Sequence, residues 1–143
     1  MGTGLTESGK AKLKKNDTLV IPETSTSGVN IVAIGNGVNN ALDSNGQIGT
    51  FGFADAGKVY VPKTVKLPST IKQIGDFAFA GTIDNTAKKV YGVSMVNLPD
   101  GLESIGNSAF LNARLTSIVL PNSVTKLGTG AFNGTDLAEK KVI

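Results

Sequence analysis

The stretch that comes closest to a chemical motif is Asp43-Ser44-Asn45-Gly46-Gln47-Ile48. It imitates positions three to eight of a calcium-binding loop, in which carboxylate and carbonyl oxygens surround the ion. Ala41 and Gly52 stand at positions one and twelve, where such a loop needs its carboxylates. Asp43 is then the only charged ligand, and Asn-Gly is also typical of a turn. The sequence therefore predicts a turn here and no metal site.

Other catalytic chemistry has little support in the composition. The 143 residues include no His and no Cys, which removes the usual general base, the thiolate nucleophile and most transition-metal ligands. A Ser–Lys dyad is compatible with the composition, yet nothing places a Ser beside a desolvated Lys. Gly35-Asn36-Gly37 begins like a dinucleotide fingerprint, but it lacks the third Gly and a βαβ context. We expect no catalytic residue, no cofactor and no enzyme.

The charge of the chain is small, at +3, and its lysines are dispersed without an aromatic platform, so we expect no nucleic-acid partner. The one basic cluster falls within a helix predicted from Gly9 to about Lys15, with Ser8 as its cap and Leu13 facing inward. Its members are Lys10, Lys12, Lys14 and Lys15. We interpret them as the solvated face of a terminal cap, with attraction to an anionic wall polymer or membrane as the alternative. No apolar run approaches the ~18 residues of a membrane span.

Three copies of one pattern organise the chain. They are VKLPSTIKQIGDFAFAGT (65–82), VNLPDGLESIGNSAFLNA (96–113) and IVLPNSVTKLGTGAFNGT (118–135). The Pro, Gly, Ala and Phe positions all recur at the same two offsets, those that lead from Pro68 to Pro99 and then to Pro121. A fixed register of four residue types indicates a repeat architecture, in which each unit stacks on its neighbours.

Each copy begins with a short strand. Val65 and Leu67, with their equivalents, are apolar at period two, so both side chains of the pair face one side. Pro68 and its equivalents end the strand, because proline has no N–H to give to a sheet. The strand side that bears Val65 and Leu67 is therefore predicted to face the interior.

The second half of each copy is predicted to turn inward. Ile71 and Ile74 give a second apolar pair, and Gly75 can take the positive φ of a sharp corner. Asp76 and its equivalents, Asn107 and Thr129, are placed to cap the first amides of a helical turn. Phe79 and its equivalents then point inward. Because one unit cannot bury its own apolar face, we expect Phe79, Phe110 and Phe132 to stack along the axis of the repeats.

The complete pattern, L-x-x-I-x-L-P-x-x-V-x-x-I-G-x-x-A-F, resembles the BspA-like leucine-rich repeat, and Leu115 to Phe132 match it at every position but one, where Leu127 stands in place of Ile. The resemblance implies an α/β-type solenoid: a leucine-rich repeat with short parallel strands on one face and turns or short helical pieces on the other. Family members often carry Cys shortly after the Ala-Phe pair. This chain differs, because it has Thr82, Ala113 and Thr135 at those positions.

The domain organisation that we expect is one structural domain in three parts. Residues 1–18 form an N-terminal helical cap, residues 19–64 a divergent first repeat or repeats with an insertion, and residues 65–143 the BspA-like repeats, the last of them incomplete. Insertions at 36–49 and 82–89 are expected to bulge from the stack. The incomplete copy at 137–143 suggests a monomeric segment of a longer chain.

The resemblance implies a non-catalytic binding or adhesion module of a bacterial secreted or cell-surface protein. Its ligand would be a protein or glycan of a host or neighbouring cell, and its location extracellular. One alternative is a structural spacer with no direct ligand. A third hypothesis, an accessory region of an enzyme, has no positive support in the residues.

Outward positions of the strands are the candidate ligand contacts, because equivalent residues form ladders across the exposed sheet face. One ladder consists of Thr64, Met95, Ser117 and Glu139, and the other of Lys66, Asn97, Val119 and Lys141. This mixed and weakly charged face favours a protein or a neutral glycan over a polyanion. The two insertions are the alternative binding surface.

Overall fold

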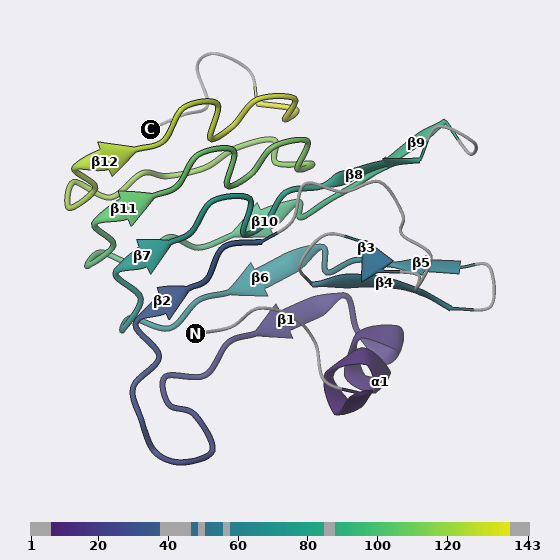
Figure 1. The fold of residues 1–143 in the computed structure, drawn as a ribbon, viewed down its shortest axis with the longest axis horizontal. Helices are drawn as coiled ribbons and strands as arrows, with labels where there is room; N and C mark the ends of the chain where they lie inside the picture. Colours follow the sequence, from purple (N-terminus) through teal and green to yellow (C-terminus); the bar gives the residue numbers. More distant parts are fainter. Residues whose placement is uncertain (1–6, 38–46, 49–50, 56–57, 85–87, 138–143) are drawn as a thin grey trace.

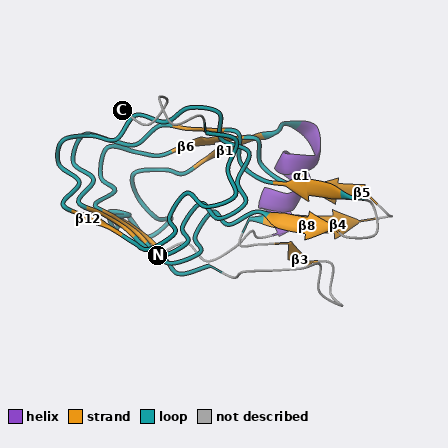
Figure 2. Cartoon of the chain, turned by 90° about the horizontal axis from the view of Figure 1, so that it is seen from above, coloured by secondary structure: helices purple, strands orange, loops and turns teal. Residues whose placement is uncertain are grey.

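The protein winds as a stack of flat coils. A computed structural model describes residues 7–37, 47–48, 51–55, 58–84 and 88–137. Figure 1 shows the successive coils lying one on another, from β1 and β2 to β12. Two parallel sheets run along this stack, and hairpins leave it on the side of α1 (Figures 1 and 2).

The first sheet has the order β1-β6-β10 and is parallel throughout. Its strands are β1 (Thr18–Val20), β6 (Thr64–Lys66) and β10 (Met95–Val96). Leu19, Val65 and Val96 occupy one register and belong to the core or pack against it. The short parallel strands expected at the start of the first two copies are thus confirmed, and Leu19 belongs to the same sheet. In the third copy Ile118 makes only an isolated bridge, so the strand expected there is not formed.

A second parallel sheet, which the sequence analysis did not predict, has the order β12-β11-β7-β2. It consists of β2 (Ala33–Ile34), β7 (Gln73–Ile74), β11 (Ser104–Ile105) and β12 (Lys126–Leu127). Ile34, Ile74 and Ile105 pair in register and are no more than 2% exposed. Seen along the stack, β12 and its neighbours lie across the interior from β1 and β6 (Figure 2).

The predicted helical pieces are turns. In the first clear copy, the Ala78 N–H donates to Gly75 O at 3.4 Å and the Ala80 N–H donates to Phe77 O at 3.2 Å. Two consecutive tight turns replace a helix because Phe77 takes a left-handed conformation with φ of 55°. Its equivalents Ser108 and Gly130 do the same, at 53° and 64°.

The one helix within the described ranges is α1 (Glu7–Lys15). Leu13 is 4% exposed, so the predicted inward face is confirmed. The helix begins at Glu7, and Ser8 therefore lies in its first turn and not at the cap position that we expected.

Glycine is required at the corner of each repeat, but not for the positive φ that we expected. Gly75, Gly106 and Gly128 have no positive φ. A Cβ on Gly106 would lie 2.6 Å from both Asp76 N and Gly75 C, and one on Gly75 would lie 2.7 Å from Gly35 C. Backbone therefore passes over backbone at each corner, and glycine is needed because neighbouring coils approach too closely for a side chain.

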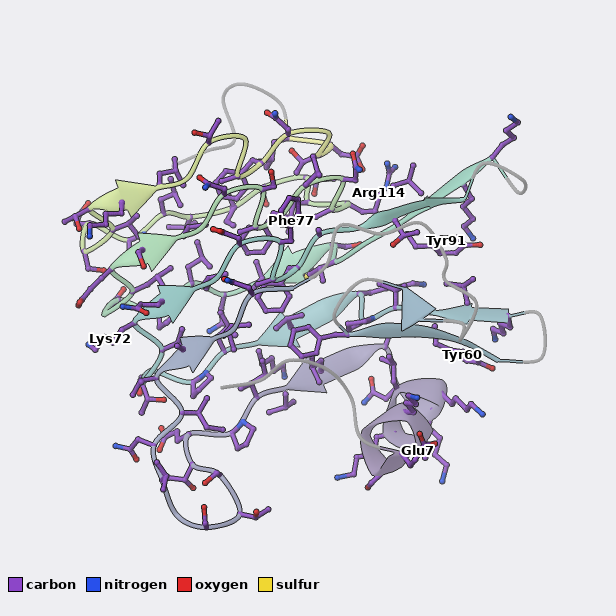
Figure 3. The ribbon with its side chains drawn as sticks, viewed as in Figure 1. Glu7, Tyr60, Lys72, Phe77, Tyr91 and Arg114 are labelled. Carbon is purple, nitrogen blue, oxygen red and sulfur yellow. The ribbon has the colours of Figure 1, made fainter. Side chains whose placement is uncertain are left out.

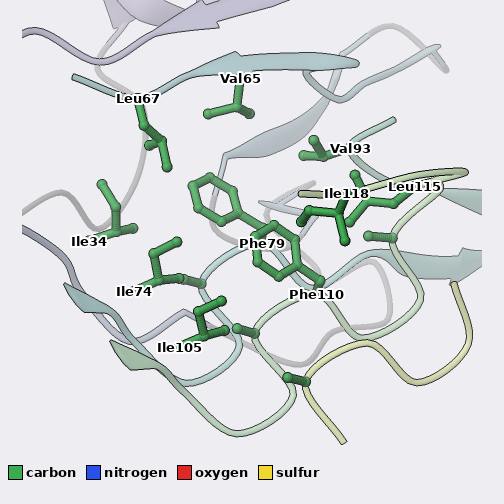
Figure 4. Packing of buried hydrophobic residues seen from close by; sticks show 14 of the residues in the cluster. Ile34, Val65, Leu67, Ile74, Phe79, Val93, Ile105, Phe110, Leu115 and Ile118 are labelled. Carbon is green, nitrogen blue, oxygen red and sulfur yellow. The ribbon is translucent and has the colours of Figure 1, made fainter. Parts of the chain in front are cut away.

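A column of phenylalanines runs through the core. Phe79 and Phe110, and likewise Phe110 and Phe132, have ring centroids 5.4 Å apart, so the predicted stack is confirmed. Phe51 extends it at 5.4 Å from Phe79. Figure 4 shows Phe79 and Phe110 between Val65 and Leu67 on one side and Ile74 and Ile105 on the other. Stacked and offset rings add to the apolar area that each coil removes from water.

Two antiparallel β units project from the stack beside α1 (Figure 1). One is the three-stranded unit β3-β4-β5, and the other is the hairpin β8-β9. Their bounds are Gln47–Ile48 for β3, Gly52–Asp55 for β4, Lys58–Tyr60 for β5, Thr82–Asp84 for β8 and Lys89–Tyr91 for β9. The predicted insertion at 82–89 falls within β8-β9, whereas most of that at 36–49 lies outside the described residues.

Candidate binding surfaces

The outward side of the first sheet, which we call the front face, gathers the described residues of both predicted ladders. Thr64 pairs with Met95 and Lys66 lies two residues along the same strand, so their side chains leave the same side of the sheet. Thr18 and Val20 of β1 pair with Thr64 and Lys66 and extend both rows by one strand. The full set is Thr18, Val20, Thr64, Lys66, Met95 and Asn97, together with Ser117 and Val119, which hold the equivalent repeat positions beyond the last paired strand, β10.

Three apolar side chains of the front face are open to solvent. Val20 is 63% exposed, Met95 64% and Val119 63%. Ile118, next to Val119, is 3% exposed, so burial alternates sharply along this segment. A shallow hollow of ≈ 420 Å³ lies on the sheet between β6 and β10, where Met95 and Lys66 contribute to its lining. Lys66 carries the only charge among the eight described residues of the front face.

Asn97 has a structural role at the end of β10. Its Oδ1 accepts a hydrogen bond from Leu67 N–H at 2.8 Å, and its Nδ2 donates to Leu67 O at 3.0 Å. The backbone pairing of β6 with β10 ends at Val96, so the side-chain amide continues the pairing by one residue. The outward residues that remain available to a partner are therefore mainly those around Val20, Met95 and Val119.

Some predicted positions fall outside the structural description. Glu139 and Lys141, the last members of the two ladders, lie beyond residue 137, and the calcium-loop imitation at 43–48 is described only at Gln47 and Ile48. Their predicted roles stay predictions. Across the described ranges no cluster of three or more Asp, Glu, His or Cys residues has metal-site geometry. No helix in those ranges has the length and hydropathy of a membrane span.

The second sheet carries a wider groove of ≈ 800 Å³ on its outer side. Its lining includes Gly35 and the corner glycines Gly75, Gly106 and Gly128, with Asn36, Asp76 and Asn107, the polar residues that follow the first three of these glycines. Asn36 Oδ1 accepts from Asp76 N–H at 2.9 Å, and Asp76 Oδ1 accepts from Asn107 N–H at 2.8 Å. These side chains join one coil to the next. We had expected Asp76 and Asn107 to cap a helical turn of their own repeat. Their side chains instead accept hydrogen bonds from the backbone of the next coil.

Comparison with known proteins places these observations in a family. Residues 41–139 match the family model described as "BspA type Leucine rich repeat region (6 copies)". Among solved structures, a leucine-rich repeat protein of T. pallidum is 25% identical in sequence, with a TM-score of 0.47. That match covers 87% of this chain and 57% of the other, so this chain spans little more than half of that protein's length. No curated protein matches.

Proposed function

Because the chain belongs to the family of BspA-type leucine-rich repeat proteins, we propose that it is a non-catalytic binding module of a secreted or cell-surface protein. Its partner is a protein that docks on the front face. The same family and fold support the proposal that residues 1–18 form a cap, residues 19–64 a divergent first part and residues 65–143 the regular repeats.

The observation that carries the proposal is the exposure of Val20, Met95 and Val119, each above 60%. None of the three belongs to the core cluster or to the partly buried apolar residues packed against it. Protein interfaces are depleted of charge at their centre and enriched in methionine and aromatic residues. A face with one lysine and an exposed methionine fits that composition better than it fits a polyanion.

A spacer function is the second candidate, and one observation favours it. Side-chain and backbone ladders join every consecutive pair of coils from Asn36 to Thr129, which suits a stiff rod. A spacer needs no contact through Met95 or Val119. The two functions therefore differ in whether the front face has a ligand.

Surface plasmon resonance against a panel of purified secreted and cell-surface proteins tests the binding function. For any protein bound, the double variant Met95→Asp and Val119→Asp is expected to weaken affinity by about tenfold or more, because two carboxylates would be buried without partners. The matched control is Val29→Asp with Val32→Asp, because these valines are 65% and 49% exposed outside the front face. Unchanged binding by the first variant excludes the front face. Absence of binding across the panel supports the spacer.

A further inference from the structure

A cleft of ≈ 430 Å³ lies between the two projecting β units. Strand β5 lines one part of it and β9 another, with Lys14 of α1 and Arg114 among the remaining lining residues. The two units diverge as they leave the stack (Figure 1), and Figure 3 shows Tyr60 on one and Tyr91 on the other. The volume is within the range of about 300–1,000 Å³ that small-ligand sites occupy.

Positive charge is concentrated in this cleft. Its lining has five cationic side chains and one carboxylate, and this excess of four is larger than the +3 of the whole chain. They are Lys14, Lys58, Lys63, Lys89 and Arg114, with Asp17. A cleft lined by one sign of charge focuses its field and raises the local concentration of oppositely charged ligands.

The two acidic partners near the cleft do not block it. Lys63 Nζ lies 3.6 Å from Asp17 Oδ2, with both side chains more than 60% exposed, and Arg114 Nη2 lies 2.9 Å from Asp136 Oδ2 with both about two-fifths exposed. Ion pairs this open to water are weak. An anion that enters the cleft can therefore compete for both cations.

An aromatic ring accompanies the charge on each wall. Lys58 Nζ lies 5.2 Å from the centre of the Tyr60 ring, and Lys89 Nζ lies 5.1 Å from that of Tyr91. Lys14 Nζ also approaches Tyr60, at 5.9 Å. Cation–π attraction keeps each ammonium beside its ring. The segment Lys58-Val59-Tyr60 recurs as Lys89-Val90-Tyr91, at the offset that also separates Phe79 from Phe110, so the two pairs are equivalent positions of successive coils.

We propose that this cleft binds an acidic polysaccharide, a chain of sugar rings that carry carboxylate or sulfate groups. The C–H face of a sugar ring is apolar and packs on a tyrosine ring, while the acidic group of the same sugar reaches the neighbouring ammonium. Two equivalent ring–ammonium pairs suit a polymer whose acidic sugars recur. The site shares no residue with the front face and does not depend on its ligand.

Nucleic acid and acidic peptide fit the cleft less well. Single-stranded nucleic acid binds where successive bases stack on open aromatic faces along a basic groove. Here the cleft is lined by two rings, Tyr60 on one wall and Tyr91 on the other, and not by a row of rings along one groove, so successive bases have no continuous surface on which to stack. An acidic peptide would supply the charge but no flat apolar face for the two tyrosines.

Isothermal titration calorimetry on the full chain tests the proposal with polygalacturonate for carboxylates, dextran sulfate for sulfates and neutral dextran as the uncharged control. Oligothymidylate and poly-glutamate represent the other two polyanions. The double variant Lys58→Gln and Lys89→Gln removes one ammonium from each wall. Lys72→Gln with Lys126→Gln makes the same change in charge at exposed positions outside the cleft. Tyr91→Leu removes a ring without changing the charge, and melting temperatures establish that each variant is folded.

The proposal predicts binding to one or both acidic polysaccharides and none to neutral dextran. Lys58→Gln with Lys89→Gln should weaken the affinity for the polysaccharide by about tenfold or more. Lys72→Gln with Lys126→Gln should weaken it by less than about twofold, because salt screens the attraction between distant charges. Tyr91→Leu should also weaken binding, which charge attraction alone would not produce. Equal losses in both lysine variants, an unchanged affinity in Tyr91→Leu, tighter binding of either of the other polyanions, or no binding at all would each overturn the proposal.

Discussion

Asp76 Oδ1 accepts a hydrogen bond from the backbone N–H of Asn107 at 2.8 Å, across the boundary between two coils. Asn107 repeats the contact with the N–H of Thr129, also at 2.8 Å. Asn36, Asp76 and Asn107, the residues after Gly35, Gly75 and Gly106, are therefore connectors between coils. Each has a side-chain oxygen one carbon beyond Cβ, so both Asn and Asp can serve there.

The first prediction concerns this connector. Asn107→Ala leaves the N–H of Thr129 without its protein acceptor and should lower the free energy of unfolding by about 0.5–1.5 kcal/mol, the usual net value of one hydrogen bond. Asn107→Asp retains the oxygen and should stay within about 0.5 kcal/mol of the parent. Urea denaturation followed by circular dichroism measures both. If the two variants lose the same stability, the hydrogen bond is not the cause.

The second prediction concerns the phenylalanine column. Phe110 is fully buried, with neighbouring ring centroids 5.4 Å away on both sides. Phe110→Ala should cost about 3–5 kcal/mol of unfolding free energy, because it removes apolar contacts and leaves a cavity between two rings. Val119→Ala, at 63% exposure, should cost less than about 0.5 kcal/mol. Similar small losses in the two variants would argue against a continuous core.

A third prediction concerns the glycine at each corner. Gly106→Ala places Cβ against backbone atoms of the preceding coil, so the coils must move apart, and we expect a loss of about 1–3 kcal/mol or more. In Gly101→Ala the nearest atom is Lys72 Nζ, the end of a flexible side chain that can turn away. That variant should be nearly neutral. Thermal melting of the pair measures the difference, and a reversed order would refute the backbone-contact explanation.

The fourth prediction concerns Asn97, which the repeat pattern placed among the candidate ligand contacts. Asn97→Ala breaks two hydrogen bonds to Leu67 and should cost about 1–2 kcal/mol. Ser117→Ala, at an exposed front-face position, provides the control and should change little. Hydrogen exchange gives a second readout, because the Leu67 amide should exchange faster in the Asn97 variant only.

The sequence predicted what each repeat needs within itself. The inward positions of Val65, Ile71 and Phe79 followed from period and spacing, because burial depends on which side of a strand or turn a residue occupies. It also predicted the phenylalanine stack between coils, but it did not reveal the close backbone contacts or the side-chain hydrogen bonds that join one coil to the next. The clash behind Gly106 and the bond from Asp76 to Asn107 join residues of different repeats, so propensities within one repeat pointed to a φ requirement and a helix cap instead.

The charged cleft escaped sequence reasoning for a related reason. Lys58 and Lys89 appear dispersed along the chain, and each tyrosine looks isolated. Stacking brings equivalent positions of successive coils together, so two ordinary Lys-Val-Tyr segments become neighbours in space. Their offset equals that between Phe79 and Phe110, and comparing the segments that precede β6 and β10 at this offset would have revealed the pair.

Coils of unequal length stack at equal spacing in this protein. The chain from Phe79 to Phe110 is longer than that from Phe110 to Phe132, yet both ring pairs are separated by 5.4 Å. The hairpin β8-β9 accommodates the extra length outside the stack (Figure 1). The hairpin is therefore a suitable site for inserting a foreign peptide or a small binding loop. The insert would be displayed at a fixed position along the stack, because contacts between the coils, and not the hairpin, hold the fold together.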